Sequence, residues 1–112
     1  MHTIQWNDFE KIDIRVGTVL RAEAFPEAKK ATYKLTIDFG NKLGIKKSSA
    51  QITQLYNPEQ LPGKQIIAVV NFPPKQIATF ISECLVLGIY NEENEVILLQ
   101  PERKVANGLK IG

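Results

Sequence analysis

Histidine and cysteine are almost absent from this sequence of 112 residues, which contains one of each, His2 and Cys84. A Ser-His-Asp or Cys-His catalytic group needs a histidine that the fold holds in place, and His2 lies at a mobile end of the chain. One histidine and one cysteine cannot make up a nitrogen–sulfur metal site. A single cysteine also forms no internal disulfide, which fits a reducing compartment. We therefore expect a protein that is not an enzyme and holds no metal and no cofactor.

Long apolar runs are also missing. No stretch approaches the roughly 20 residues of a membrane-spanning helix, and residues 1–8 lack the basic and apolar regions of a signal peptide. Neither a Walker loop nor a dinucleotide-binding fingerprint is present. We expect a single cytoplasmic domain without membrane insertion, because 112 residues is close to the commonest domain size.

Two groups of residues keep other chemistry open. Ser48 and Ser49 follow Lys46 and Lys47, and a lysine can replace histidine as the base beside a serine nucleophile. The simpler interpretation is a solvated strand. The acidic residues of 92–95 offer oxygen ligands to a hard cation, or they form an exposed turn, which is the interpretation we favour.

Alternation of apolar and polar residues predicts a series of short strands. Residues 12–25 alternate, with Leu20 on the core-facing side and Gly17 at a bend. Residues 32–40 alternate as well and are followed by a turn at Gly40. The core-facing residues of this second strand are Tyr33, Leu35, Ile37 and Phe39.

Three further regions complete the predicted sheet. Residues 43–52 form an unusually polar strand, whereas residues 64–72 are nearly all apolar and are expected to be buried on both faces. Residues 84–90 and 95–99 read as a closing hairpin. Helix is limited to residues 6–11, with Asn7 and Glu10 as a capping box, and to a short helix at residues 53–56.

This pattern predicts an all-β fold, an OB-fold five-stranded barrel with short helices and N- and C-terminal extensions. Residues 1–112 form one domain, with an N-terminal extension at 1–11, the barrel at 12–100 and a C-terminal extension at 101–112. Apolar residues lie in both extensions, outside the barrel strands. They are Ile4, Trp6, Val105, Leu109 and Ile111. Because such ends need a surface to cover them, we expect a homodimer with a two-fold interface.

Positive charge is concentrated in the middle of the chain. Between Lys29 and Lys75 there are eight lysines and two acidic residues, although the net charge of the whole chain is only +2. Lys34, Lys46 and Lys47 fall on the second and third predicted strands, the face with which OB-folds bind oligonucleotides. This segment is either a nucleic-acid-binding face or a lysine-rich solvated surface.

The segment 71–83 combines proline, polar and apolar residues between two buried strands. Pro73 and Pro74 are expected to stiffen it into extended geometry, so that Phe72, Ile77 and Phe80 wall an apolar pocket for an extended peptide. The alternative is that the aromatic residues pack beneath the segment.

Several runs resemble the tRNA-binding-domain family. Residues 12–17 (IDIRVG) are similar to its opening strand, and Asn71, Pro74 and Lys75, followed by residues 82–83 (SE), are similar to its second motif. The resemblance is closer still to one branch, the CsaA-type proteins. It spans nearly the whole chain, through residues 6–17, 33–40, 44–53, 69–77 and 107–112.

The resemblance implies an OB-fold homodimer that acts as a chaperone in protein export by binding unfolded preproteins or peptides. The wider family implies tRNA binding. Together with the basic strand, it gives the tRNA-binding candidates Lys34, Lys46, Lys47, Ser48, Gln51, Asn71, Lys75 and Ser82. The peptide-binding candidates are Phe72, Pro73, Pro74, Ile77 and Phe80.

Overall fold

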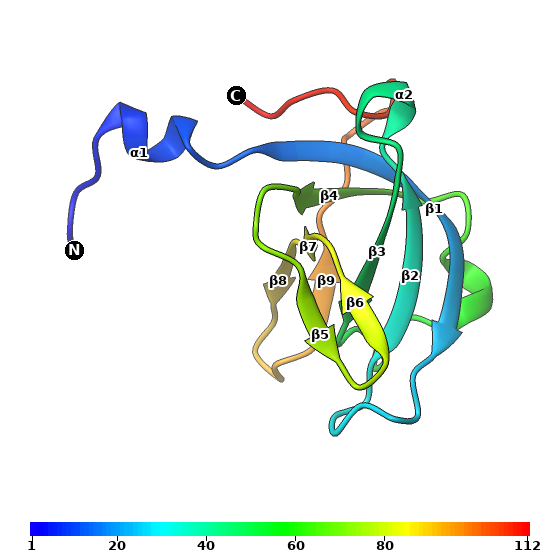
Figure 1. Cartoon of the computed structure of the whole chain (residues 1–112). Coiled ribbons are helices and arrows are strands. Elements are labelled where there is room, and N and C mark those ends of the chain that lie inside the picture. The colour runs from blue at the N-terminus through cyan, green and yellow to red at the C-terminus, as the bar shows by residue number, and fades with distance from the viewer.

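The computed structural model describes residues 1–112, and most of its regular structure is strand. A five-stranded antiparallel sheet of order β3-β2-β1-β4-β7 curls into a nearly closed barrel (Figure 1), which confirms the predicted OB-like fold. Two hairpins, β5–β6 and β8–β9, extend from it. The strands are β1 (Ile14–Ala24), β2 (Tyr33–Asp38), β3 (Ile45–Ala50), β4 (Gln65–Val69), β5 (Lys75–Ile77), β6 (Phe80–Ser82), β7 (Leu85–Val86), β8 (Gly88–Tyr90) and β9 (Val96–Leu98).

The long strand β1 serves both sides of the barrel. Its first half pairs with β4 and its second half with β2. A Cβ at Gly17 would lie 2.7 Å from the Ile37 side chain, so the crossing of β1 over β2 needs a glycine. The predicted alternation is wrong from Val19 onward. With Leu20 facing inward Val19 would face outward, but Val19 is 1% exposed and Leu20 46% exposed, and an irregularity between Val19 and Arg21 shifts the register.

The core forms where β1, β2 and β4 meet. The four residues of β2 and its end that were predicted to face inward are all buried, and Leu35, Ile37 and Phe39 are at most 1% exposed. β4 is buried on both faces, as its apolar run predicted, except at Ile67. This part of the chain follows directly from its hydrophobic pattern.

The helical predictions need correction. Helix α1 (Trp6–Glu10) exists, but its capping box is formed by Gln5 and Asp8. The helix begins at Trp6, whereas a capping box of Asn7 and Glu10 would start it at residue 8. Residues 53–55 form a turn and not the predicted helix over 53–56, and a 3-10 helix, η1 (Pro58–Gln60), follows. Gly40 opens a one-turn helix, α2 (Gly40–Leu43), in place of a simple turn.

The segment 71–83 also differs from the prediction. Its second part is the hairpin β5–β6, whose two-residue turn holds Ala78 at a φ of +53°. The predicted closing hairpin is only partly right. β8 pairs with β9, but β7, earlier in the same run, pairs with β4 and joins the main sheet.

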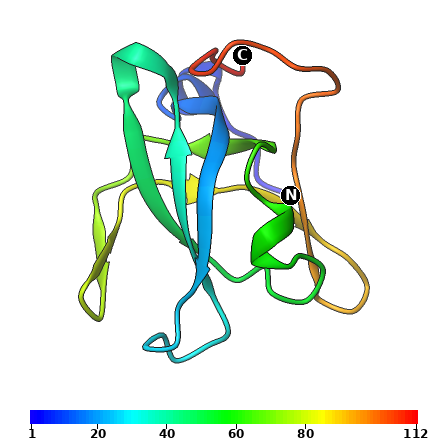
Figure 2. The same ribbon diagram turned by 90° about the vertical axis from the view of Figure 1, so that its right-hand side faces the viewer.

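The two ends of the chain behave differently. Residues 105–111 lie along the first half of β1, where Gly108 donates to the Val16 carbonyl at 2.7 Å and Ile111 donates to the Ile14 carbonyl at 2.9 Å. Helix α1 projects away from the barrel in Figure 1 and lies behind it in the view of Figure 2, and Trp6 is 68% exposed. No helix has both the length and the apolar character needed to cross a membrane.

Candidate functional site

One seam of the barrel, between β3 and the segment that leads from Glu83 into β7, is closed along only part of its length. The Ser48 hydroxyl donates to the Cys84 carbonyl at 2.8 Å. Beside it, the Glu83 amide donates to the Lys47 carbonyl at 2.7 Å, and the Glu83 carboxylate accepts from the Lys47 amide at 2.9 Å. Past these contacts no ladder joins the two strands, and the seam opens.

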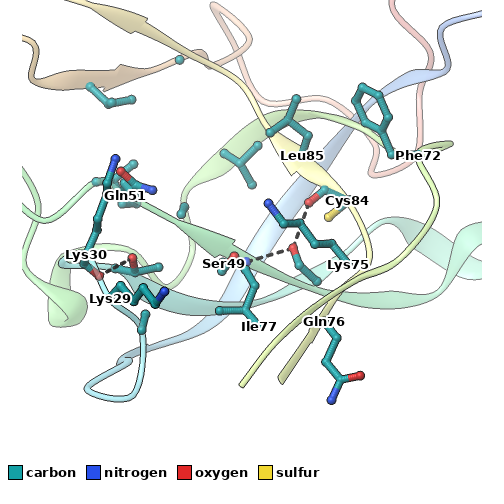
Figure 3. Close-up of a pocket in the computed structure, with 18 of the residues that line it drawn as sticks. Lys29, Lys30, Ser49, Gln51, Phe72, Lys75, Gln76, Ile77, Cys84 and Leu85 are labelled. Carbon is teal, nitrogen blue, oxygen red and sulfur yellow. Dashed lines mark hydrogen bonds between the residues drawn. The ribbon is translucent and has the colours of Figure 1, made fainter. Parts of the chain in front are cut away.

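A groove of about 1330 Å³ occupies the open part of the seam (Figure 3). The end of β3 and residues 51–52 line one side, residues 85–88 and Tyr90 line the other, and the hairpin β5–β6 contributes a third wall through Lys75 and Ile77. Figure 3 shows Ile77 and Lys75 beside Ser49 and Cys84, below Phe72 and Leu85. About half of the lining residues are hydrophobic, 12 of 23, so the groove can hold apolar side chains.

The charged residues of the groove are mostly positive. Lys29 and Lys30, from the loop between β1 and β2, and Lys75, from β5, are all exposed at its edge. Glu27 is the single acidic residue of the lining. The groove therefore combines an apolar interior with a basic rim, which favours an anionic or neutral ligand over a cationic one.

Cys84 lies in the wall of this groove, buried to 6% exposure. Burial raises the pKa of its thiol from 9.0 to about 11, and the hydrogen bond with Ser48 offsets only part of that effect. A thiol with so high a pKa is protonated at neutral pH and is a poor nucleophile. Cys84 thus contributes packing to the site.

The tRNA-binding candidates fall into two groups in the structure. Lys75, Gln51 and Ser82 line the groove, and Lys46 and Lys47 lie on β3. The remaining three make internal contacts. Ser48 is fully buried in the seam, Asn71 bridges the Asp13 amide and the Lys11 carbonyl, and the Lys34 ammonium lies over the rings of Phe25 and Phe80.

The peptide-binding candidates are divided as well. Phe72, Pro73 and Ile77 line the groove, and Phe72 is 54% exposed. Pro74 is exposed beside the groove but does not line it. Phe80, the partner of Ile77 across the hairpin, packs edge-on against Phe25 with ring centroids 5.4 Å apart, and it does not line the groove. Its contact is the packing alternative that the sequence had left open.

The wall formed by residues 85–90 was missed, because an apolar run after Cys84 reads as buried strand. Leu85 is 47% exposed and Tyr90 73% exposed. One signal was available. An apolar strand at the edge of a sheet, next to a segment rich in proline, need not have a second strand beside it, so its outer side can stay exposed.

Comparison with known proteins agrees with this architecture. The family model described as "Putative tRNA binding domain" matches residues 14–110. A methionine–tRNA ligase of Bacteroides fragilis is 35% identical over 108 residues, which is 96% of this chain. The chain spans only 16% of the length of that ligase.

Two solved structures are similar over the full length. The chaperone CsaA of Bacillus anthracis is 54% identical, with a TM-score of 0.93, and the match covers 99% of this chain and 100% of that one. The CsaA chaperone of Picrophilus torridus is 55% identical, with a TM-score of 0.92, and covers 98% and 100%. The comparisons thus relate the chain to a binding domain and to chaperones, which are non-catalytic classes.

Proposed function

This chain belongs to the tRNA-binding-domain family, and from that premise we propose that it binds extended segments of unfolded proteins in the groove at the barrel seam, as a CsaA-type chaperone for preproteins in export. The observation that carries this proposal is the groove itself. Its apolar walls are open to solvent, and Phe72, Leu85 and Tyr90 are exposed along them. Exposed apolar groups in a concave site mark a place where an apolar ligand gains by leaving water.

A direct test is the fluorescence anisotropy of a labelled peptide from an unfolded preprotein. Binding should survive high salt and show a negative heat-capacity change, because apolar burial dominates it. Phe72→Ala should weaken the affinity several-fold. Leu20→Ala is the matched control, since Leu20 is 46% exposed on β1 and does not line the groove. Equal losses in both variants would place the peptide elsewhere.

A second candidate function, tRNA binding, is favoured by the basic rim and the neighbouring lysines. Lys47 is exposed on β3, and Lys29, Lys30 and Lys75 border the groove. Lysine supplies charge for phosphate contacts, and Gln51 and Ser82 supply hydrogen-bonding groups beside them. A dimer would present two such rims to a single RNA.

The salt dependence of binding separates the two functions. Affinity for bulk tRNA should fall by about 0.7 log units per log unit of salt for every single-strand phosphate contact. Lys46→Ala combined with Lys47→Ala should flatten that slope, and so should Lys75→Gln. Lys104→Ala, in the exposed segment after β9, is the control. If neither the β3 double variant nor Lys75→Gln changes the slope, this face is excluded as the RNA site.

We also infer that two copies pair through the terminal extensions. Ile4, Trp6 and Leu109 are 69%, 68% and 53% exposed, and Trp6 has only Phe9 of its own helix as an aromatic neighbour, at 5.5 Å. Sedimentation should give the mass of two chains, and Trp6→Ala should shift it toward one. As a partner of preproteins before export, the protein would act in the cytoplasm.

A further inference from the structure

Residues 85–90 run from β7 through Leu87 into β8, and this extended segment is paired on one side only. Its first part pairs with β4, where the Leu87 amide donates to the Ile67 carbonyl at 2.8 Å. Its second part pairs with β9, where Leu99 donates to the Leu87 carbonyl at 3.2 Å and Asn91 donates to the Glu95 carbonyl at 3.0 Å. β4 and β9 therefore follow one another along the same edge of this strand.

The spacing of those bonds identifies the free groups. In an antiparallel ladder, residues bonded to the partner alternate with residues whose N–H and C=O face the other way. Because the bonded positions are Leu87, Ile89 and Asn91, the backbones of Val86, Gly88 and Tyr90 face the opposite edge. The Leu98 amide agrees with this register, since it donates to the Tyr56 hydroxyl at 3.0 Å and not to β8.

This unpaired edge borders the groove. Val86, Gly88 and Tyr90 all line it, together with Leu85 and Leu87. The previous outward position, Cys84, has its carbonyl bonded to Ser48 across the seam. The edge is thus continuous with the closed part of the barrel, and it lacks a partner where the groove opens.

A peptide backbone is the complement of such an edge. Alternating N–H and C=O groups at about 3.3 Å per residue match another extended chain, and alternate side chains of that chain would point into the groove. The rim adds a preference for charge, with Lys29, Lys30 and Lys75 against Glu27. An extended segment with alternating apolar residues and an acidic side chain fits both features.

We propose that the ligand of the groove is an extended peptide that adds as a strand to the outer edge of residues 85–90, pairing with the backbones of Val86, Gly88 and Tyr90 and completing the seam next to β3. This inference rests on the proposed peptide-binding function and specifies how the peptide is held. Main-chain bonds make such a site tolerant of sequence, and the rim selects against basic segments.

A pair of variants at Tyr90 tests the backbone contact. Tyr90→Pro removes the outward N–H and places a ring on the free edge, a position at which proline is compatible with a strand. Tyr90→Ala removes the same side chain but keeps the N–H. A labelled peptide of alternating Leu and Thr with one Asp should bind Tyr90→Pro about three- to tenfold more weakly than Tyr90→Ala, as expected for one lost backbone bond. Equal affinities would overturn the inference.

Amide hydrogen exchange provides a second measurement on the unaltered protein. Saturation with the peptide should slow exchange at Val86, Gly88 and Tyr90 by about tenfold or more, while Leu87 and Ile89, which are already paired, change little. Uniform slowing, or no slowing at the three outward amides, would contradict strand addition. Protection of these three amides in the free protein would also contradict it, because a second copy would then cover the edge.

The outcomes separate this inference from the function it rests on. If the unmodified peptide does not bind, the proposed function fails. Two further peptides carry N-methyl groups at every second residue, one at the odd positions and one at the even positions. If the unmodified peptide binds and both methylated peptides bind equally weakly, only strand addition fails. Bulk tRNA is the competing ligand, and protection of the outward amides by tRNA and not by peptide would assign the edge to RNA and overturn the inference.

Discussion

The Ser48 hydroxyl donates a 2.8 Å hydrogen bond to the Cys84 carbonyl, and this bond lies at the point where the barrel seam stops being closed. Ser48 is fully buried. The Ser82 hydroxyl approaches the same carbonyl at 3.4 Å, which is a weaker contact. A side chain thus takes the place of the strand ladder that a closed barrel would have here, next to the contacts between Glu83 and Lys47.

Ser48→Ala should destabilise the fold by about 1–3 kcal/mol, because it leaves a buried carbonyl without its main donor. Chemical denaturation measures the change in the free energy of unfolding. Ser49→Ala is the control, since the Ser49 side chain is only half-buried, and its loss should remain within about 0.5 kcal/mol. Equal losses would show that the seam is held by its other contacts.

Lys34→Met should cost about 0.5–1 kcal/mol of stability, because it removes a charge that lies 5.2 Å from the Phe25 ring centroid and 5.9 Å from that of Phe80. Thermal denaturation can detect this loss. Lys47→Met, at an exposed position of β3, should change stability less. If Lys34→Met abolished tRNA binding without any loss of stability, Lys34 would be a ligand-contacting residue and not a packing residue.

Ala78→Gly should stabilise the hairpin β5–β6 by about 0.5–1 kcal/mol. Ala78 is the first residue of the two-residue turn and has a φ of +53°, which a residue with a Cβ adopts only at a cost. Positive φ at the first central position alone is typical of a type II′ turn, in which glycine is favoured there. Thr79→Gly should give no gain, and a higher melting temperature in that variant would contradict this account.

Cys84 should make stability fall at alkaline pH. Burial raises the pKa of the folded thiol to about 11, from 9.0, so between these values the unfolded chain loses its proton and the folded chain keeps it. This contribution is complete below pH 9 and is lost as the pH rises through about 11, with a total of up to about 3 kcal/mol.

The measurement is the free energy of unfolding between pH 8 and about 11, for the protein and for Cys84→Ala, so that lysine and tyrosine titrations cancel in the difference. The variant should lose less stability across this range. Thiol labelling at pH 8 should also be slow until the protein is denatured. Fast labelling of the native protein would contradict the burial of this group.

The hydrophobic pattern was sufficient for the core and insufficient for the site. Tyr33, Leu35, Ile37 and Phe39 could be placed because β2 is buried on one face, which fixes the register. The shift after Val19 could not be foreseen, because an irregularity changes which residues face inward without changing their order. The basic and proline-rich segments contain Lys75, Phe72 and Ile77, which line the groove, and their part in binding stays a prediction.

The remaining site residues depend on contacts between distant parts of the chain. From the sequence, Lys34 is an outward-facing lysine on a strand; in the structure its ammonium group contacts Phe25 and Phe80, which are distant in sequence. From the sequence, Asn71 is a candidate ligand-binding amide; in the structure its side chain is hydrogen-bonded to the backbone of residues 11 and 13. The outer edge of residues 85–90 is free only because β4 and β9 share the other edge, which no local pattern encodes.

The pairing of residues 105–111 with β1 has a consequence for synthesis on the ribosome. Arg15 donates to the Gly108 carbonyl at 3.0 Å, across 93 positions of sequence. Translation proceeds at about 5–20 residues per second, so the first half of β1 waits several seconds for this neighbour. During that time it is an open strand edge on a nascent chain, and we expect this pairing to form only after residues 105–111 have left the exit tunnel.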